Sequence, residues 1–142
     1  MAVGGSIEVD TGGTDTDVAV RLEIVNKAPF GEPAYVVGPH PRSGVAEGVY
    51  LGILAIDVPG AAFDLRWDGA EQLVAEGPDG LARVVATTVQ LARGEQRELT
   101  LRFRLPEGVA GLRVEPSARE PAIAWRSSDE RWVDDHAERV EW

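Results

Sequence analysis

Alternating apolar and polar positions run through much of this chain. In DVAVRLEIVN, residues 17–26, aliphatic side chains fall at every second position, and the same alternation recurs in ELTLRFRL, residues 98–105. Successive side chains of a β-strand point to opposite faces of its sheet, so this period predicts two half-buried strands. Residues 49–56, VYLGILAI, are instead apolar on both alternating faces. This pattern is typical of a strand that is covered on both sides.

Shorter apolar segments between glycine, proline and aspartate turns predict the remaining strands. About eight short strands separated by turns, with no repeating β-α-β alternation, predict an all-β fold. We expect an antiparallel β-sandwich with immunoglobulin-like architecture, and a β-barrel is the alternative. The segments that predict these further strands are residues 34–37, 62–67, 73–75, 81–91, 112–114 and 123–125.

The pattern divides the chain into three parts. Residues 1–17 hold an expected N-terminal edge strand and an acidic glycine turn, residues 18–126 form the sandwich domain, and residues 127–142 form a tail. The start MAVGGS lacks the charged and apolar regions of a signal peptide, and no apolar run approaches the roughly 18 residues of a membrane span. We therefore expect no insertion of this chain into a membrane.

The C-terminal tail has features of a helix. Ser127 and Glu130 have the spacing of a helix capping box, and Trp132, His136 and Val140 recur every four residues. A four-residue spacing places side chains on one face of a helix. We therefore expect a short helix, or a loosely docked tail, after the sandwich domain.

Composition narrows the classes of function. The 142 residues include 24 acidic and 14 basic side chains, for a net charge of −10, and no cysteine. An acidic chain repels phosphate groups, which disfavours nucleic acid and anionic membranes as partners. Without cysteine there is no disulfide, no thiolate metal site and no thiol nucleophile. We expect no cofactor, and the use of arginine for every basic residue but Lys27 suggests a high-GC bacterium.

An acidic loop is the first candidate site. The segment VDTGGTDTDV places Asp10, Asp15 and Asp17 around a glycine pair. Calcium prefers carboxylate and carbonyl oxygens, so the three aspartates are candidate metal ligands. Their spacing does not match an EF-hand loop, in which carboxylates alternate before a glycine. The sequence favours a glycine turn in which aspartate and threonine side chains bind nearby backbone amides.

Catalytic residues are harder to nominate. A Ser-His-Asp triad would have to draw on His40 or His136 with Ser43 or Ser128, and no glycine-flanked nucleophile elbow surrounds either serine. Residues 134–136 offer two carboxylates and an imidazole in succession, but on a helix these would point in different directions. We expect a solvated acidic surface there and no enzyme activity.

Aromatic side chains are the candidate ligand contacts. Exposed rings on a sandwich face can stack on sugars, which makes Trp67 and Tyr35 candidate ligand-binding residues. The alternative is that the tryptophans, including Trp125, Trp132 and Trp142, anchor the core and the tail.

Two segments resemble a known family. Residues 25–38, VNKAPFGEPAYVVG, and residues 50–61, YLGILAIDVPGA, are similar to the C-terminal extracytoplasmic region of an actinobacterial cell-envelope family, known as domain of unknown function number four thousand and twelve. Gly94-Glu95 before LTLRF at residues 99–103 is also similar. The resemblance spans residues 18–126. It implies an envelope-associated β-sandwich at the end of an anchored protein and carries over no catalytic residues.

These observations predict a non-catalytic β-sandwich that supports interaction or assembly in a bacterial cell envelope. Its partners would be proteins or other domains of its parent chain, and residues 49–56 would pack under the C-terminal tail or against such a partner. A carbohydrate-binding module for cell-wall glycans is the first alternative, and a hydrolase is the second. An extracytoplasmic location is expected, with the cytoplasm as the alternative.

Overall fold

The computed structural model describes residues 1–31, 44–70, 73–117, 122–128 and 130–142. Within these ranges the chain is all-β, and none of it forms a helix. The strands are β1 (Ala2–Asp10), β2 (Thr16–Val25), β3 (Tyr50–Pro59), β4 (Phe63–Asp68), β5 (Leu73–Asp79), β6 (Ala82–Leu91), β7 (Gln96–Leu105), β8 (Gly111–Val114), β9 (Ala124–Arg126), β10 (Arg131–Val133) and β11 (Glu138–Glu141).

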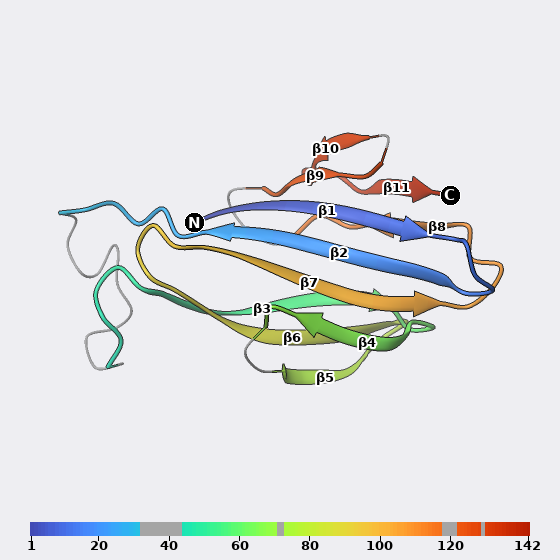
Figure 1. Ribbon diagram of the computed structural model, residues 1–142, viewed down its shortest axis with the longest axis horizontal. Coiled ribbons are helices and arrows are strands. Elements are labelled where there is room, and N and C mark those ends of the chain that lie inside the picture. The colour runs from blue at the N-terminus through green and yellow to red at the C-terminus, as the bar shows by residue number, and fades with distance from the viewer. Residues whose placement is uncertain (32–43, 71–72, 118–121, 129) are drawn as a thin grey trace.

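The strands form three sheets in which almost all pairs are antiparallel (Figure 1). The largest sheet has the order β10-β9-β1-β2-β7-β4, a second has the order β3-β6-β5, and β8 pairs with β11. β1 is antiparallel to β2 and parallel to β9, so both of its edges are paired. The expectation of an N-terminal edge strand is therefore wrong, because the C-terminal strand β9 covers that edge.

The six-stranded and three-stranded sheets enclose a shared hydrophobic core. β2 and β7 pair along their whole length, from Thr16 opposite Leu105 to Val25 opposite Gln96. Their alternate aliphatic side chains face the three-stranded sheet, which confirms the two predicted half-buried strands. The buried side chains that meet between the sheets are Val18, Val20, Leu22, Ile24, Leu99, Leu101 and Phe103 from β2 and β7, with Val58, Val85, Val89 and Leu91 from β3 and β6.

The tail after residue 126 forms strands, so the expected helix or loosely docked tail is wrong. The ring of Trp132 in β10 stacks on Trp125 in β9, with 6.2 Å between ring centroids, and Val140 of β11 is buried in the core. The four-residue spacing does not reflect a helix, because Trp132 and Val140 lie in separate strands and His136 lies in the turn between them. The capping-box residues close a turn between β9 and β10: Ser127 N donates to Glu130 O (2.9 Å), and Glu130 N donates to Ser127 Oγ (3.3 Å).

A glycine in β1 lets the tail dock. The parallel register of β1 and β9 places Gly5 opposite Trp125 and Gly4 opposite Ala124. A Cβ atom at Gly5 would lie 2.5 Å from Cζ3 and 2.8 Å from Cδ2 of Trp125, whereas nothing lies within 4 Å of a Cβ atom at Gly4. The indole of Trp125 therefore occupies the space that a side chain at Gly5 would need.

Asn26, the only asparagine of the chain, closes the end of β2. Its side chain is buried, and its Nδ2 donates to Gly48 O (2.7 Å) and to Leu91 O (3.0 Å). Its Oδ1 accepts from Ala28 N (3.0 Å). One amide thus connects β2, the end of β6 and the residues that precede β3. The predicted strand at residues 34–37 lies outside the described residues.

Candidate functional site

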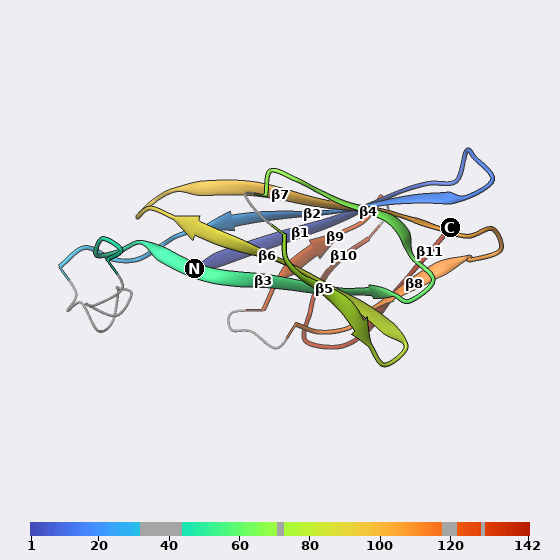
Figure 2. The same cartoon turned by 90° about the horizontal axis from the view of Figure 1, so that it is seen from below.

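The side of the three-stranded sheet that faces away from the core carries aliphatic side chains; this sheet lies in front in Figure 2. On β3, Leu54 and Ile56 pack on the core, so the alternate residues Leu51 and Ile53 point outward. Their side chains are 50% and 65% exposed, respectively. Two neighbouring outward positions of one strand are therefore large, aliphatic and in contact with water.

A row of alanines extends this surface across the sheet. Ala55 of β3 is opposite Ala86 of β6, and Ala86 is opposite Ala75 of β5. Residues in register in adjacent strands share one face, so the three methyl groups lie on the same side as Ile53. Small side chains leave this part of the sheet flat. We call the surface formed by Leu51, Ile53, Ala55 and Ala75 the aliphatic face; Ala86, between the last two, is itself buried.

The aliphatic face corrects one expectation about residues 49–56. Their inner side is covered by the six-stranded sheet, as predicted, but their outer side is exposed at Leu51 and Ile53. On the inner side, Ile56 lies in the same core cluster as Trp132, Val140 and Trp142 of the tail, as expected. The expectation that both sides of residues 49–56 are covered is wrong, because Leu51 and Ile53 on the outer side are exposed.

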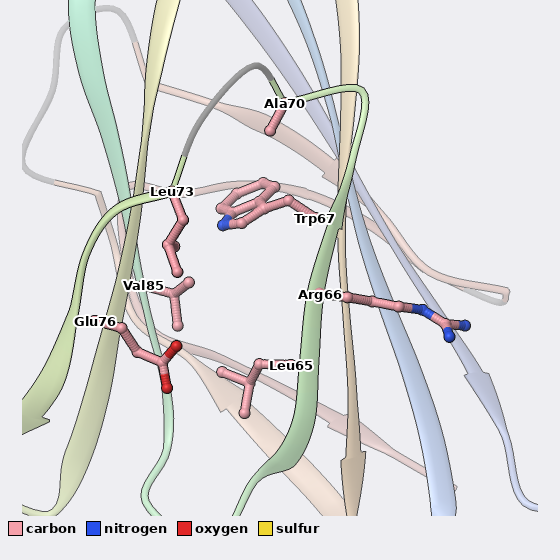
Figure 3. A pocket seen from close by; sticks show the side chains of 7 residues that line it. All are labelled: Leu65, Arg66, Trp67, Ala70, Leu73, Glu76 and Val85. Carbon is pink, nitrogen blue, oxygen red and sulfur yellow. The ribbon is translucent and has the colours of Figure 1, made fainter.

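A cavity of about 210 Å³ opens between β4 and β5, the terminal strands of their sheets (Figure 3). Leu65 and Trp67 point into it from β4, Leu73 and Glu76 point into it from β5, and the Arg66 side chain points away. The Trp67 Nε1 atom is buried and has no hydrogen-bond acceptor among the described residues. Among the described residues, Ala70 and Val85 also line it.

The other aromatic candidates lie in different surroundings. Tyr35 lies outside the described residues, and Trp67 forms a cavity wall between two sheets. Trp125 and Trp132 stack on each other and are half-buried, while Trp142 Nε1 donates to Val109 O (3.1 Å). The described tryptophans therefore act as anchors of the core and the tail and do not form one open platform.

One arginine partly offsets the negative charge of the acidic loop. Asp10 Oδ1 accepts from Gly12 N (2.9 Å), which is a bond within the turn. The guanidinium of Arg104 in β7 supplies positive charge to the other carboxylates. Its nitrogens lie 3.8 Å from Asp15, 3.3 Å from Asp17 and 3.6 Å from Asp64. Across the described ranges, no group of three histidine, aspartate or glutamate side chains is placed to hold a metal ion.

The histidine candidates do not form a triad in the part of the chain that is described. His40 and Ser43 lie outside it. His136 Nδ1 contacts the Asp135 carboxylate, and its Nε2 lies 3.4 Å from Glu138 Oε2. The hydrogen bond to Asp135 raises the pKa of His136 above its usual value. Both ring nitrogens thus face carboxylates, whereas a catalytic base would direct one of them toward a nucleophile.

Asp134 has a structural environment. Its side chain is buried, and its carboxylate accepts hydrogen bonds from Ser117 N (3.1 Å) and Ile123 N. Burial raises the pKa of this carboxyl group, but the hydrogen bonds from Ser117 and Ile123 outweigh burial, so its pKa lies below the usual value. Asp134 thereby fastens the residues before β9 to the tail. It points into the protein, away from the exposed neighbours Asp135 and His136.

No protein-family model, curated protein or solved structure matches this chain. A helix long and apolar enough to span a membrane is not found in the described residues. Among the described residues, the aliphatic face and the cavity between β4 and β5 are two candidate binding surfaces.

Proposed function

We propose that this chain is a non-catalytic interaction module of a bacterial cell-envelope protein, and that another protein or another domain of its parent chain docks on the aliphatic face. The exposure of Ile53 and Leu51 on the regular strand β3 carries this proposal. Burial of apolar surface stabilises a complex by about 25 cal/mol per Å². Contiguous exposed aliphatic side chains on a soluble domain are therefore typical of an interaction site.

The edge of β3 supports the same function. β3 is the terminal strand of its sheet and pairs with β6 without a bulge from Tyr50 to Pro59. Edge strands that avoid partners usually carry charged residues, proline or a bulge, and β3 carries Asp57 and Pro59 only in its last three residues. β3 has no lysine, and its outward residues are uncharged until Asp57. A flat, regular edge next to an aliphatic face suits a partner that packs on the face and reaches this edge.

The layout of the sheets supports an immunoglobulin-like sandwich as the type of fold. Within the six-stranded sheet, β1-β2-β7-β4 together with β3-β6-β5 match the four-plus-three arrangement of constant-type immunoglobulin domains, and β9 and β10 extend the larger sheet beyond it. The connections differ. In an immunoglobulin domain the last three strands along the chain are E, F and G, whereas β5, β6 and β7 lie at the positions of G, F and E. The likeness therefore rests on the layout of the strands and not on their connection.

The envelope location is supported by the resemblance of residues 18–126 to the actinobacterial family. Carbohydrate binding has less support, because Trp67 lines a cavity and Trp125 stacks on Trp132. Hydrolysis has less support, because both nitrogens of His136 face carboxylates. Neither alternative uses the exposed side chains of β3.

Site-specific crosslinking tests the proposal. A photoreactive phenylalanine analogue is placed at Ile53 of the full chain in the cells that produce the parent protein. The matched control carries the same analogue at Glu23, an exposed position on the outer side of the six-stranded sheet. We expect one dominant protein adduct from position 53 and none of it from position 23. Identical adducts from both positions, or no adduct from position 53, would contradict the proposal.

A further inference from the structure

We propose that the partner that covers the aliphatic face is a second copy of this chain, related to the first by a two-fold axis. This inference rests on the proposed function, because it names the occupant of the same surface. The face lies on the outside of the molecule, on the side of the three-stranded sheet that points away from the core (Figure 2). Ile53 and Ala75 are both exposed there, so both are open to a partner.

The aliphatic face has a ridge beside a low floor. The ridge is formed by Leu51 and Ile53, which are 50% and 65% exposed. The floor is a row of alanines, Ala55, Ala86 and Ala75, which lie in register across the three strands. In a two-fold contact the same patch meets itself, so a self-complementary patch needs a protrusion beside a matching depression. The face meets this requirement, because each copy can seat its ridge on the alanine row of the other.

The position of the ridge determines how the two copies cross. The middle of the alanine row is two residues along the strand from Ile53, about 7 Å, and one to two strands across, about 5 to 10 Å. Because these offsets are similar, a two-fold axis that carries Ile53 onto the row runs in the plane of the face at about 45° to the strands. The strands of the two copies then cross at about 90°, which is one of the two preferred ways in which sheets pack face to face.

Charge restricts which surfaces of two copies can meet. Each chain has a net charge of −10, so two copies repel each other unless the surfaces in contact carry little charge. The β6 residues in register with the ridge, Gln90 and Thr88, are uncharged, and Asp57 is the first charged residue along β3. The two-fold rotation carries Asp57 beyond the edge of the facing sheet. The outer side of the six-stranded sheet instead carries Glu23 opposite Glu98, so of these two surfaces the aliphatic face is the one on which copies can approach.

The size of the face predicts a weak dimer. Three strands about 4.8 Å apart and about seven residues of 3.4 Å each cover roughly 15 by 24 Å. This area is well below the roughly 800 Å² that each partner buries in a standard interface. We therefore expect monomers at about 10 µM and dimers at about 1 mM, in the range of transient complexes.

A charge-exchange experiment tests the second copy. Ile53→Lys places a lysine in the ridge, and Ala75→Glu places a carboxylate in the alanine row on which that ridge packs. Each variant alone should dimerise about tenfold more weakly than the unchanged chain, because its dimer buries an unpaired charge. An equimolar mixture pairs the new lysine with the new carboxylate at one contact and keeps the unchanged residues at the other, so the dimer should return. Both variants stay strongly acidic, so their net charges cannot draw them together. Masses are measured by sedimentation equilibrium.

Val133→Lys and Ala124→Glu are the matched controls. Val133 and Ala124 are paired in register and exposed on the outer side of the six-stranded sheet, so these variants should dimerise like the unchanged chain. Nearly equal melting temperatures establish that all four variants are folded. An unchanged chain that stays monomeric at about 1 mM, a mixture that forms no dimer, or loss of the dimer in the controls would overturn the second copy. In that case an adduct of position 53 with a different protein would still support the proposed function.

Discussion

Replacement of Gly5 by alanine tests how the N-terminal strand and the tail depend on each other. The added methyl group would lie 2.5 Å from Cζ3 and 2.8 Å from Cδ2 of Trp125. Carbon atoms in contact are normally about 3.5 to 4.0 Å apart, so the indole has to move by about 1 Å. The same movement disturbs its stack on Trp132. Gly5→Ala should therefore destabilise the protein although alanine suits a strand better than glycine.

The magnitude follows from three contributions. Overpacking of a filled site costs about 1 to 3 kcal/mol, and a disturbed aromatic pair costs a further 0.5 to 1.5 kcal/mol, approximately. Alanine lowers the entropy of the unfolded chain, which returns about 0.4 to 1 kcal/mol. The net destabilisation is about 2 kcal/mol. For a domain of this size, that lowers the melting temperature by about 4 to 8 °C.

Gly4→Ala is the matched control, because nothing lies within 4 Å of its added methyl group. Its melting temperature should equal that of the unchanged protein or exceed it slightly. Thermal unfolding is followed by circular dichroism, and the near-ultraviolet signal of the tryptophans should weaken in Gly5→Ala only. Equal melting temperatures of the two variants would refute the packing of Trp125 on Gly5.

Three further predictions concern residues with buried or paired polar groups. Asn26→Ala removes three hydrogen bonds, so it should lower the free energy of unfolding in a urea titration by about 2 to 4 kcal/mol. The control Gln90→Ala, at an exposed position of β6, should leave that free energy nearly unchanged. The pKa of Asp134 is lower in the folded than in the unfolded chain, so its contribution to stability is complete above the ordinary pKa of 3.8 and is lost as the pH falls through the folded-state value. Asp134→Asn should melt at a lower temperature at neutral pH and approach the unchanged protein in acid, and parallel pH profiles would contradict this. Arg104→Ala leaves the carboxylates of Asp15, Asp17 and Asp64 without their arginine, so calcium should raise the melting temperature of this variant more than that of the unchanged protein. Equal rises in melting temperature would show that Arg104 does not offset these charges.

The strands that could be predicted from the sequence are those with one face in the core and one in water. In β2 and β7 the alternation of aliphatic and charged residues follows directly from that environment. β3 was also predicted as a strand, but apolar residues on both of its faces do not reveal what covers each face. The structure shows that Leu51 and Ile53 are exposed, so an apolar pattern here indicates a surface and not a second core.

The tail and the candidate sites depend on contacts between distant residues, and this is why the sequence did not predict them. Trp132 and Val140 lie in β10 and β11, with His136 in the turn between them, and the pairing of these strands with β9 and β8 replaces the helix that the spacing suggested. The pairing of β1 with β9 joins the two ends of the chain, and no local pattern indicates it. The cavity lies between strands of different sheets, and Leu65 and Trp67 were predictable only as inward positions of one strand.

The affinity of the partner crosslinked from position 53 tests the central claim most directly. It is measured by calorimetry for the unchanged chain and for Ile53→Lys, whose side chain is 65% exposed in the free protein. Substitution at such a position should leave the melting temperature nearly unchanged. A lysine charge forced into the centre of an apolar interface should weaken binding about 100-fold, which corresponds to about 2.7 kcal/mol. Equal affinities of the two folded proteins would contradict the claim that the aliphatic face is the docking surface.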